Sequence, residues 1–337
     1  MPAKFIQTES GASHAPGLSR RDLLALGGGL LLPALASAQA YPARVVRLMV
    51  GAPAGGGLDT YARIVAQPLA EALGNSVVVE NKAGAGGVTN SAYVATSRPD
   101  GATVLYTTAT PLIVAPQAMR KPPFDPLTDF VPVIRVGTTP LSFAVNPKLG
   151  VKNLNDLVAL SKRRQISIAS GSGTGGQLHL MIEALIQATG ANILHVPYKG
   201  TAPSIVDTIA GHIDGCTSDV ASFIPFHQEG TLTIIAVSSE KRLDVLPDVR
   251  AAVEDIPGFV MVSWQGIFVP AKTPKSVIDQ LNAAMLKVLA RTDVQAQFRK
   301  SAVDTSPMAN PEAFPKFVSS EYQRWGKLLK DKGIVMD

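Results

Sequence analysis

Residues 44–87, RVVRLMVGAPAGGGLDTYARIVAQPLAEALGNSVVVENKAGAGG, decide the fold class. The apolar, β-branched run Val45–Val50 stops at Gly51, which predicts a buried strand that ends in a turn. Gly55–Gly57 follow, and a helical pattern begins near Asp59. Glycines let the backbone approach a ligand closely, and the first N–H groups of a helix carry partial positive charge. The stretch therefore predicts a site for a small anion, such as a carboxylate, that needs no lysine.

Strand-like and helical patterns alternate along most of the remaining chain, which is typical of an α/β fold. A second cycle repeats the first, with a strand at Ile166–Ala169, a glycine-rich loop at Ser170–Gly176 and a helix at Gln177–Thr189. Residues 111–132 contain six prolines and predict a surface loop with a short helix. Further strands are expected at 77–80, 103–106, 142–145, 193–196, 213–217, 233–237 and 264–269, and further helices at 154–162, 203–210, 275–289 and 315–329.

The first forty residues read as an export signal rather than as part of the fold. Ser19–Leu24 (SRRDLL) is a twin-arginine pattern, the apolar run Leu23–Leu35 follows it, and Ala38-Gln39-Ala40 is a small-residue cleavage site. The apolar run is shorter than the ~20 residues that a spanning helix needs, and an uncleaved membrane anchor is the alternative. We therefore expect cleavage after Ala40 and a periplasmic location.

Composition and motif content narrow the function classes. The chain has 337 residues and a net charge of +5, with basic residues spread along the sequence, which argues against nucleic acid as a partner. The single cysteine, Cys216, forms no intrachain disulfide, and its place in an apparent strand predicts a buried, unreactive thiol. The five histidines show no paired ligand spacing, so we expect no metal site. Nucleophile-elbow and P-loop motifs are absent from the sequence, and we expect no cofactor and no catalytic residue.

Four further motifs carry a resemblance to one protein family. They are Phe124–Pro126 with Asp129–Val133 (FDP and DFVPV), His195–Gly200 (HVPYKG), Ser263–Gly266 (SWQG) and Pro270–Pro274 (PAKTP). In these motifs and in the first glycine loop, the chain resembles the extracytoplasmic solute-binding proteins of tripartite tricarboxylate transporters, the Bug or TctC-like family. The resemblance covers nearly all of the chain after residue 40 and appears in the same order.

The resemblance implies a periplasmic binding protein-like fold of type II, with two α/β domains joined by a two-crossing hinge and the ligand cleft between them. Domain 1 would comprise residues 41–137 and 264–337, and domain 2 residues 138–263. The resemblance further implies a receptor for a small carboxylate ligand that docks on integral membrane transporter subunits, and we expect a monomer. The alternative function is that of a ligand sensor for a signalling partner.

The candidate ligand-binding residues of the first loop are Pro53, Ala54, Gly55, Gly56 and Asp59. Asp59 stands where a side chain caps a helix, and the resemblance also places it near the ligand, so both roles stay open. The resemblance maps a second group onto the family's second ligand loop, with tight turns as the alternative role of its glycines. This group is Ser170, Gly171, Gly173 and Thr174.

The remaining candidates follow expected strand ends, where open α/β sheets bind ligands. Thr107 and Thr108 offer hydroxyl groups to a carboxylate, or they serve only the turn. Tyr198 and Lys199 follow another strand, and Lys199 is either a charge partner or an exposed lysine. Asp219 faces the cleft or caps the segment that follows it.

Gly171–Gly176 also matches the dinucleotide fingerprint G-x-G-x-x-G, so an exported NADP-dependent oxidoreductase is the alternative function. A dinucleotide site places an acidic residue about 20 positions further on. Residues 189–201 contain no acidic residue, which favours the smaller anion.

Three features depart from a regular helix or from the family pattern. Pro68 predicts a kink in the first helix. The family often has histidine where this chain has Gln177, and the nearest histidine here is His179. Residues 251–258 are shorter than in the family, which bears on the second hinge crossing.

Overall fold

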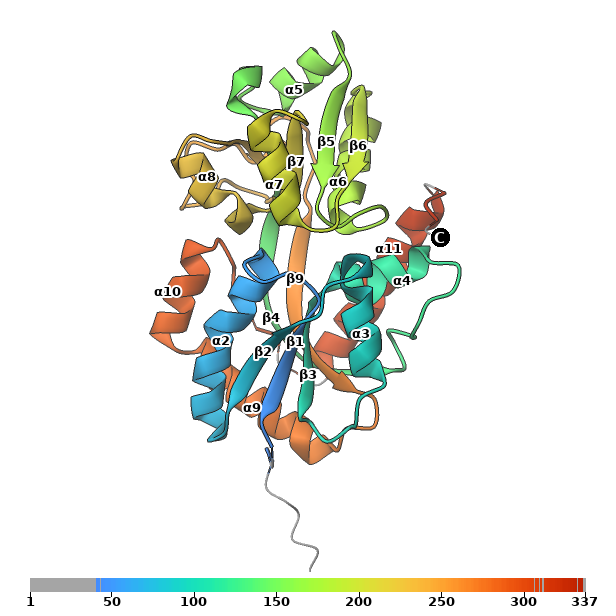
Figure 1. Ribbon diagram of the computed structural model, residues 1–337, viewed down its shortest axis with the longest axis vertical. Helices are drawn as coiled ribbons and strands as arrows, with labels where there is room; N and C mark the ends of the chain where they lie inside the picture. Colours follow the sequence, from blue (N-terminus) through green and yellow to red (C-terminus); the bar gives the residue numbers. More distant parts are fainter. Residues whose placement is uncertain are drawn as a thin grey trace, which may run out of the picture. The chain divides into compact units, whose positions relative to one another are not determined.

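A nine-stranded mixed sheet runs through the structure (Figure 1). The structure is a computed structural model that describes residues 41–42, 44–305, 307–308, 310, 312–331 and 333–335, and the expected export signal at 1–40 lies outside them. The strands are β1 (Val46–Val50), β2 (Val77–Asn81), β3 (Thr103–Thr108), β4 (Phe130–Val145), β5 (Ile166–Ser170), β6 (Ile193–Pro197), β7 (Gly215–Asp219), β8 (Thr233–Val237) and β9 (Val262–Pro270).

The strand order divides this sheet into two halves that share β4. The first half has the order β2-β1-β3-β9-β4, and the second has the order β6-β5-β7-β4, with β8 also paired to β4. In each half the first three strands are parallel, and β4 is antiparallel to its neighbours. β4 pairs with β9 from Phe130 to Pro140 and with β7 from Leu141 to Val145. We call the two half-sheets with their helices the first lobe and the second lobe.

The connections between strands are mostly helical. The helices are α2 (Gly57–Leu73), α3 (Val88–Ala95), α4 (Ala115–Ala118), α5 (Leu154–Ser161), α6 (Gln177–Thr189), α7 (Thr201–Ala210), α8 (Ile224–Gln228), α9 (Lys275–Leu289), α10 (Thr292–Lys300) and α11 (Ala313–Asp331). Short helical turns are η1 (Ala85–Gly87), η2 (Thr110–Val114), η3 (Pro147–Leu149), η4 (Val220–Ser222) and η5 (Ala252–Glu254). In the first lobe α2 packs on α9 and β2, and α11 packs on β4.

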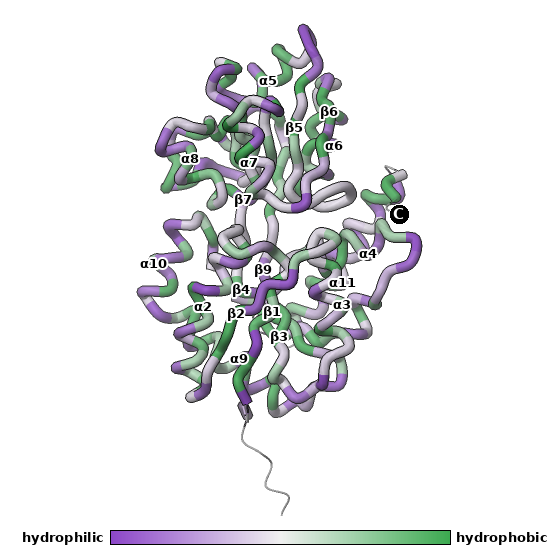
Figure 2. Tube along the Cα trace, in the orientation of Figure 1, coloured by the Kyte–Doolittle hydropathy of each residue, from purple (hydrophilic) through white to green (hydrophobic). Residues whose placement is uncertain are grey.

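Both faces of the first half-sheet are covered, as parallel strands require. Leu48 of β1 packs in one apolar cluster with Tyr61 and Leu69 of α2, whereas Met49 belongs to the cluster on the other face. Successive side chains of a strand point to opposite faces, so this division follows from the pleat. In Figure 2 the apolar colour runs along parts of both the strands and the helices. The prediction of an α/β architecture is confirmed.

The proline-rich stretch at 111–132 corrects one prediction, because its first part is buried rather than a surface loop. Thr110–Ala118 forms η2 and α4, and Leu112, Ile113 and Val114 of this segment are fully buried. Pro111 occupies the first turn of this helical segment, where its missing N–H costs nothing.

Two other expectations concern helix and hinge geometry. α2 continues through Pro68 from Gly57 to Leu73, with Pro68 on its buried face, and the expected bend stays a prediction. β4 is longer than predicted, since it begins at Phe130 and spans 16 residues. The expected division into residues 41–137 with 264–337 and 138–263 therefore places a boundary inside β4, and it also stays a prediction.

Candidate functional site

The first glycine loop, Pro53–Gly57, joins the end of β1 to the start of α2. Gly55 has a left-handed φ of 81°, a conformation that glycine adopts without strain. Its N–H donates to Oδ2 of Asp59 at 2.9 Å. In the described part of the chain, the N–H groups of Ala54 and Gly57 have no acceptor. The loop therefore keeps two backbone donors, one of them at the positive end of α2.

The carboxylate of Asp59 is committed to the protein itself. The side chain is buried, and besides the Gly55 amide it accepts from Nε of Arg63 and Nδ2 of Asn81, both at 2.9 Å. Burial alone raises the pKa of Asp59, but the bonds from Arg63, Gly55 and Asn81 outweigh it and lower that pKa below its usual range. Of the two roles left open by the sequence, this geometry favours capping.

Gly56, another candidate of the first loop, has no free backbone amide to offer a ligand. Its N–H donates to the carbonyl oxygen of Pro53 at 3.3 Å. A Cβ at Gly56 would meet only that oxygen at 3.4 Å, which is ordinary contact. The steric need for glycine therefore lies elsewhere in the loop, at Gly57.

The second glycine loop, Ser170–Gly176, joins β5 to α6 and is tied down by internal bonds. The Ser170 hydroxyl donates to the carbonyl oxygen of Gly173 at 3.0 Å, and the N–H of Gly173 returns to the Ser170 carbonyl at 3.4 Å. The N–H of Gly175 donates to Nδ1 of His179 at 3.0 Å. Two of the loop's amides are thus used to hold its shape.

Three other N–H groups of the second glycine loop remain unpaired. Within the described residues, the amides of Ser172, Thr174 and Gly176 have no acceptor. Gly171 is required for close packing, because a Cβ there would lie 2.6 Å from Oγ1 of Thr201. The second lobe therefore presents a cluster of backbone donors just before the N-terminus of α6, where negative charge is stabilised.

The lobes approach one another around these two loops. A Cβ built on Gly86 of η1 would lie 3.3 Å from the Ser172 carbonyl oxygen in the second glycine loop. The N–H of Gln177, the first residue of α6, donates to Oγ1 of Thr110 at 3.1 Å. Figure 1 shows α2, α3 and the loop before α6 gathered around the crossing strands β4 and β9.

Asp219, the last residue of β7 in the second lobe, also contacts the first lobe. A Cβ on Gly57 would collide with Oδ2 of Asp219, so this carboxylate lies against the N-terminus of α2. The same Oδ2 accepts from Oγ of Ser222 at 3.2 Å, and Asp219 stands at the N-cap position of η4. Burial raises the pKa of Asp219 above its usual value. Asp219 stands at the N-cap position but makes no side-chain bond to a backbone N–H there, so of the two roles that the sequence left open the geometry supports the one that faces the other lobe.

Sequence reasoning missed a group of buried polar side chains where α6 meets β4 and β9. Oε1 of Gln177 accepts from Oγ of Ser263 at 3.3 Å, and Nε2 of Gln265 donates to Oγ1 of Thr139 at 2.5 Å. The second polar atom of each amide, Nε2 of Gln177 and Oε1 of Gln265, is buried without a partner in the described part. Gln177 therefore has a free donor and Gln265 a free acceptor.

Asn90, in the first turn of α3, has the same property. It is fully buried, and neither Oδ1 nor Nδ2 has a partner among the described residues. It lies near the end of β1, since a Cβ on Gly51 would be 3.4 Å from its own Cβ. A buried amide without partners is costly, so such groups indicate the place of a ligand or ordered water. Asn90 stands between Thr89 and Ser91, so the sequence carried no signal of its burial.

The position of Thr107 and Thr108 corrects a prediction, because they are the last two residues of β3 and do not follow it. In the ladder with β9 they lie opposite Gly266 and Gln265, respectively. Thr107 is buried and Thr108 is half-buried. Thr108 is therefore the member of the pair that sits beside the buried amide of Gln265.

Tyr198 and Lys199 follow β6, as expected, but their side chains have different surroundings. The Tyr198 hydroxyl donates to Oδ2 of Asp207 at 2.5 Å, and this bond raises the pKa of Tyr198 to about 12. Lys199 is exposed and has no side-chain partner in the described part. The next residue, Gly200, lies beside the first loop, since its Cβ would be 3.6 Å from Cγ of Pro53.

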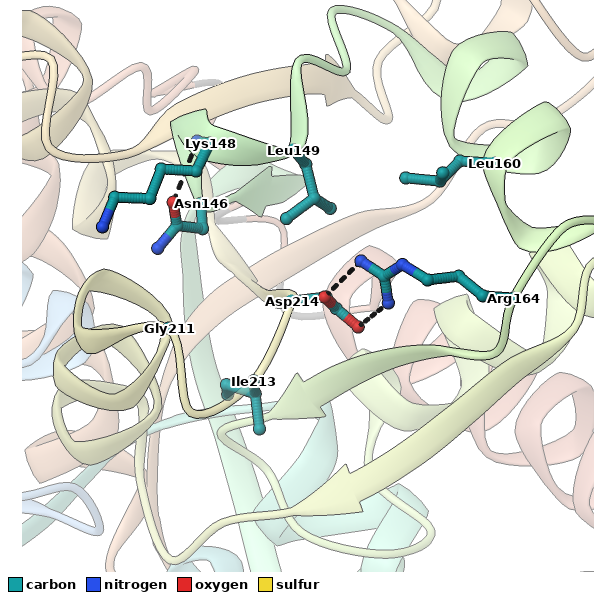
Figure 3. A pocket seen from close by; sticks show the side chains of 8 residues that line it. All are labelled: Asn146, Lys148, Leu149, Leu160, Arg164, Gly211, Ile213 and Asp214. Atoms are coloured by element: carbon teal, nitrogen blue, oxygen red, sulfur yellow. Dashed lines mark hydrogen bonds and ion pairs between the residues drawn. The ribbon is translucent and has the colours of Figure 1, made fainter.

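Two surface pockets of the described part bear on the position of the site. One, of about 520 Å³, adjoins the first glycine loop and is lined by Ala54, Gly55, Asp59, Thr60, Arg63, Ile64 and Gln297. The other, of about 370 Å³, lies in the second lobe, near the start of β5 and β7 (Figure 3). That end of the strands is the one away from the second glycine loop.

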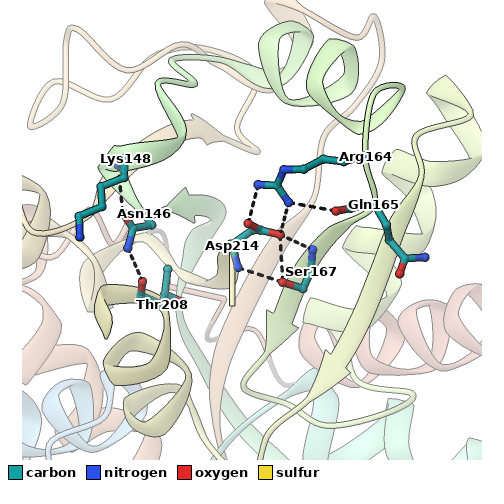
Figure 4. A network of polar contacts seen from close by, with 7 residues as sticks. All are labelled: Asn146, Lys148, Arg164, Gln165, Ser167, Thr208 and Asp214. Carbon is teal, nitrogen blue, oxygen red and sulfur yellow. Dashed lines mark hydrogen bonds and ion pairs between the residues drawn. The ribbon is translucent and has the colours of Figure 1, made fainter. Parts of the chain in front are cut away.

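The polar groups of the second-lobe pocket are already paired with each other. Figure 3 shows Arg164 bonded through both terminal nitrogens to Asp214, at 2.8 and 3.0 Å. Asp214 also accepts from the N–H and hydroxyl of Ser167, and Asn146 donates to the Thr208 carbonyl (Figure 4). This network stabilises the lobe and leaves little capacity for a ligand.

Metal and thiol chemistry receive no support from the described residues. No three His, Cys, Asp or Glu side chains among them lie together in a way that would hold a metal ion. Cys216 is fully buried, and burial raises the pKa of its thiol to about 12. The prediction of a buried thiol is confirmed.

Two α/β lobes that share β4, with glycine loops after their parallel strands, define the class of periplasmic binding proteins. The chain belongs to the tripartite tricarboxylate transporter family receptors, whose family model matches residues 61–334. The sequence-based assignment to this family, and with it the solute-binding function and the type of fold, is confirmed.

Individual relatives agree with this assignment. Protein BugT of Bordetella pertussis is 34% identical over 303 residues, which cover 89% of this chain and 93% of BugT. The structure of the periplasmic binding protein BugD matches with a TM-score of 0.81 at 33% identity, over 88% of this chain and 100% of that one. The R. palustris protein Rpa4515 with adipate matches with a TM-score of 0.81 at 30% identity, over 88% of this chain and 99% of that one. The family is one of receptors and BugD is a periplasmic binding protein, which does not favour the alternative of an NADP-dependent oxidoreductase.

Proposed function

We propose that this chain captures a small carboxylate in the periplasm by closing two sets of unpaired backbone amides around it, and that it does so without chemistry. The donors of the first lobe are the N–H groups of Ala54, in the loop, and of Gly57, at the N-terminus of α2. Those of the second lobe are the N–H groups of Ser172, Thr174 and Gly176. A carboxylate has two oxygens that accept several such bonds, and helix N-termini favour its charge.

The observation that carries this proposal is the placement of unpaired donors on both lobes where the lobes meet. Buried backbone N–H groups of folded proteins are nearly always paired, and the first N–H groups of a helix have no partner within it. Five unpaired amides on two loops where the lobes meet, some of them exposed, are therefore available to an acceptor supplied from outside. The adipate carried by Rpa4515, a relative at 30% identity, supports a ligand with carboxylate groups.

The buried amides contribute the rest of the site in this proposal. Asn90, Gln177 and Gln265 each have an unpaired polar atom, and Thr108 lies opposite Gln265. These groups offer both donors and acceptors, which suits the uncharged part of a ligand or ordered water that bridges to it. Among the remaining candidates, Asp219 restricts the space at the start of α2, and Lys199 adds a positive charge at the rim.

The same proposal covers location and partners. The twin-arginine signal would direct the chain to the periplasm, with cleavage after Ala40, and the loaded monomer would dock on the integral membrane subunits of a tripartite transporter. The family membership supports a transporter partner. β4 and the segment that enters β9 would act as the hinge, in a closing motion typical of such receptors.

A thermal-shift screen of the purified protein tests the proposal. The panel contains adipate, citrate and benzoate, the neutral diamide of adipic acid, and NADP⁺. A ligand that binds only the folded state stabilises it by RT ln(1 + [L]/Kd), so the midpoint of unfolding rises with the logarithm of its concentration above Kd. We expect stabilisation by at least one carboxylate and none by the neutral diamide. Stabilisation by NADP⁺ alone, or by the diamide as well as adipate, would contradict the proposal.

A further inference from the structure

Two histidines of the second lobe are stacked directly under the second glycine loop. His179 lies in the first turn of α6 and His195 on β6, and their ring centroids are 3.9 Å apart with an interplanar angle of 24°. His179 is buried, and His195 is half-buried. The proposed site uses neither ring as a ligand contact, although both belong to elements that hold the loop.

Each ring makes one hydrogen bond to the loop. Nδ1 of His179 accepts from the Gly175 N–H at 3.0 Å, so this nitrogen carries no proton. Nε2 of His195 lies 2.7 Å from Oγ of Ser170. Because the Ser170 hydroxyl donates to the Gly173 carbonyl oxygen, His195 acts as the donor to Ser170. The loop is thereby held at both ends by neutral imidazoles.

The ionisable groups around the pair are few. On α6 itself, Oε1 of Glu183 lies 3.5 Å from Nε2 of His179. β5 carries no titratable side chain, and Cys216 and Asp219 of β7 make no interaction with either ring within the described residues. Burial and the neighbouring ring lower the pKa of His195 to about 4. Burial lowers the pKa of His179, with Glu183 acting in the opposite direction.

We propose that His179 and His195 are positioning residues that hold the second glycine loop in its ligand-binding shape, and that acid releases the ligand by protonating them. A proton on Nδ1 of His179 converts the acceptor of the Gly175 N–H into a donor, so this bond breaks. A second proton on the stack places two positive charges 3.9 Å apart. The inference rests on the proposed function, since it assigns a pH dependence to the same site.

Two substitutions separate positioning from titration. Asparagine at 179 keeps an acceptor near the place of Nδ1, and glutamine at 195 keeps an amide near the place of Nε2, but neither side chain titrates. Adipate affinity is measured by calorimetry between pH 7.5 and pH 4.5. We expect His179→Asn and His195→Gln to bind as the wild type does at pH 7.5. At pH 4.5 the wild type should have lost about tenfold more affinity than His179→Asn, which corresponds to one pKa unit of coupling.

The titration of adipate itself is common to all variants and cancels in this comparison. His179→Leu removes the acceptor, so its affinity should be reduced at every pH. The matched control is His212→Asn, because the His212 ring is exposed, pairs with Asp207 at 3.3 Å and makes no hydrogen bond to the loop in the described part. Parallel pH profiles for the wild type and His179→Asn would overturn the inference.

A second readout needs no ligand and keeps the two proposals apart. Hydrogen exchange of the Ser170–Gly176 amides, followed by mass spectrometry, is compared as protection factors, because intrinsic exchange slows as pH falls. The protection factors of the wild type should drop between pH 7.5 and pH 4.5, and those of His179→Asn should drop less. If no carboxylate binds at any pH, the proposed function fails. The exchange measurement still shows whether protonation of the histidines loosens the second glycine loop. Equal exchange in both proteins would also overturn the inference.

Discussion

Gly57 illustrates how a single residue couples the two lobes. The residue opens α2 in the first lobe, and the Asp219 carboxylate of the second lobe occupies the space where a side chain would begin. The φ of Gly57 is not in the left-handed region, so no backbone strain requires glycine here. The requirement is steric and arises only when the lobes are together.

Gly57→Ala should therefore weaken ligand capture more than it weakens the fold. The added methyl group would push Asp219 away from the N-terminus of α2 and hold the lobes apart. We expect the Kd for adipate, measured by calorimetry, to rise about tenfold, equivalent to about 1.4 kcal/mol.

Gly150→Ala is the matched control for this substitution. Gly150 has a φ of 68° and open space around it, so alanine costs stability through the backbone without touching either loop. We expect it to lower stability by about 1 kcal/mol and to leave Kd unchanged. Equal affinities in Gly57→Ala and the wild type would show that the contact with Asp219 does not matter for capture.

For single residues, the positions of the two glycine loops could be predicted from the sequence, but the role of each side chain could not. The two roles of Asp59 could not be separated, because its partner Asn81 is 22 positions away and comes from β2. The hydroxyl of Tyr198 bonds to Asp207 on α7, a pairing that depends on how that helix lies. Asn90 and Gln265 were missed because an amide becomes informative only when it is known to be buried and unpaired.

Among the elements, α11 is anchored by one carboxylate that two tryptophans share. Glu321 is buried, and its Oε2 accepts from Nε1 of Trp264 at 3.2 Å and from Nε1 of Trp325 at 3.0 Å. Trp264 lies on β9, so this carboxylate joins the last helix to the strand that enters the first lobe.

Glu321→Ala should lower the free energy of unfolding by about 2–4 kcal/mol, because it leaves two buried indole N–H groups without an acceptor. Urea unfolding followed by tryptophan fluorescence measures the change. Glu312→Ala is the control on the same segment, since Glu312 is exposed and its ion pair with Lys316 is solvated, so a change within about 0.5 kcal/mol is expected. A loss as small as that of the control would contradict the anchoring role.

Helices and strands could be predicted from the sequence where a single apolar pattern runs through the whole element. Helix α6 begins and ends at the predicted residues, and β8 does as well, because their apolar periodicity is uninterrupted. β4 was recognised only in its last four residues, because Pro132 and Pro140 suggest a break. In the first lobe β4 is the last strand of the half-sheet order, and proline is tolerated in such strands.

Over the whole molecule, stability should depend on pH in two stages. The pKa values of His179 and His195 are lowered in the folded state, so the stability that their neutral forms contribute is lost as pH falls from about 6.5 toward 4. The pKa values of Asp214 and Glu254 are also lowered, the latter to about 2, so their contribution is lost only at lower pH. Asp219, with a raised pKa, acts in the opposite sense.

The unfolding midpoint of the wild type should therefore decline from about pH 6.5 downward, whereas the double variant His179→Asn/His195→Gln should hold its midpoint to about pH 4. Differential scanning calorimetry in 0.5 pH steps measures both profiles. The three carboxylates are the same in both proteins, so the difference between the profiles isolates the histidines. Coincident profiles would show that protonation of His179 and His195 does not lower the stability of the protein.

The overall division into two similar half-sheets followed from the sequence, because two strand–glycine loop–helix cycles occur in order. How closely the lobes approach did not follow, since it depends on contacts such as Thr110 with Gln177 between distant segments. The family resemblance supplied the class of ligand, and the geometry supplies the donors that would hold it.

The central claim is that unpaired amides of both loops bind the carboxylate, and backbone NMR during an adipate titration tests it most directly. An N–H that gains a charged acceptor shifts its proton resonance downfield. The account predicts large downfield shifts for the amides of Gly57, Ser172 and Thr174, saturating together, and smaller ones for the already bonded Gly55 and Gly175. Saturable binding that leaves the amides of Gly57, Ser172 and Thr174 unshifted would contradict it.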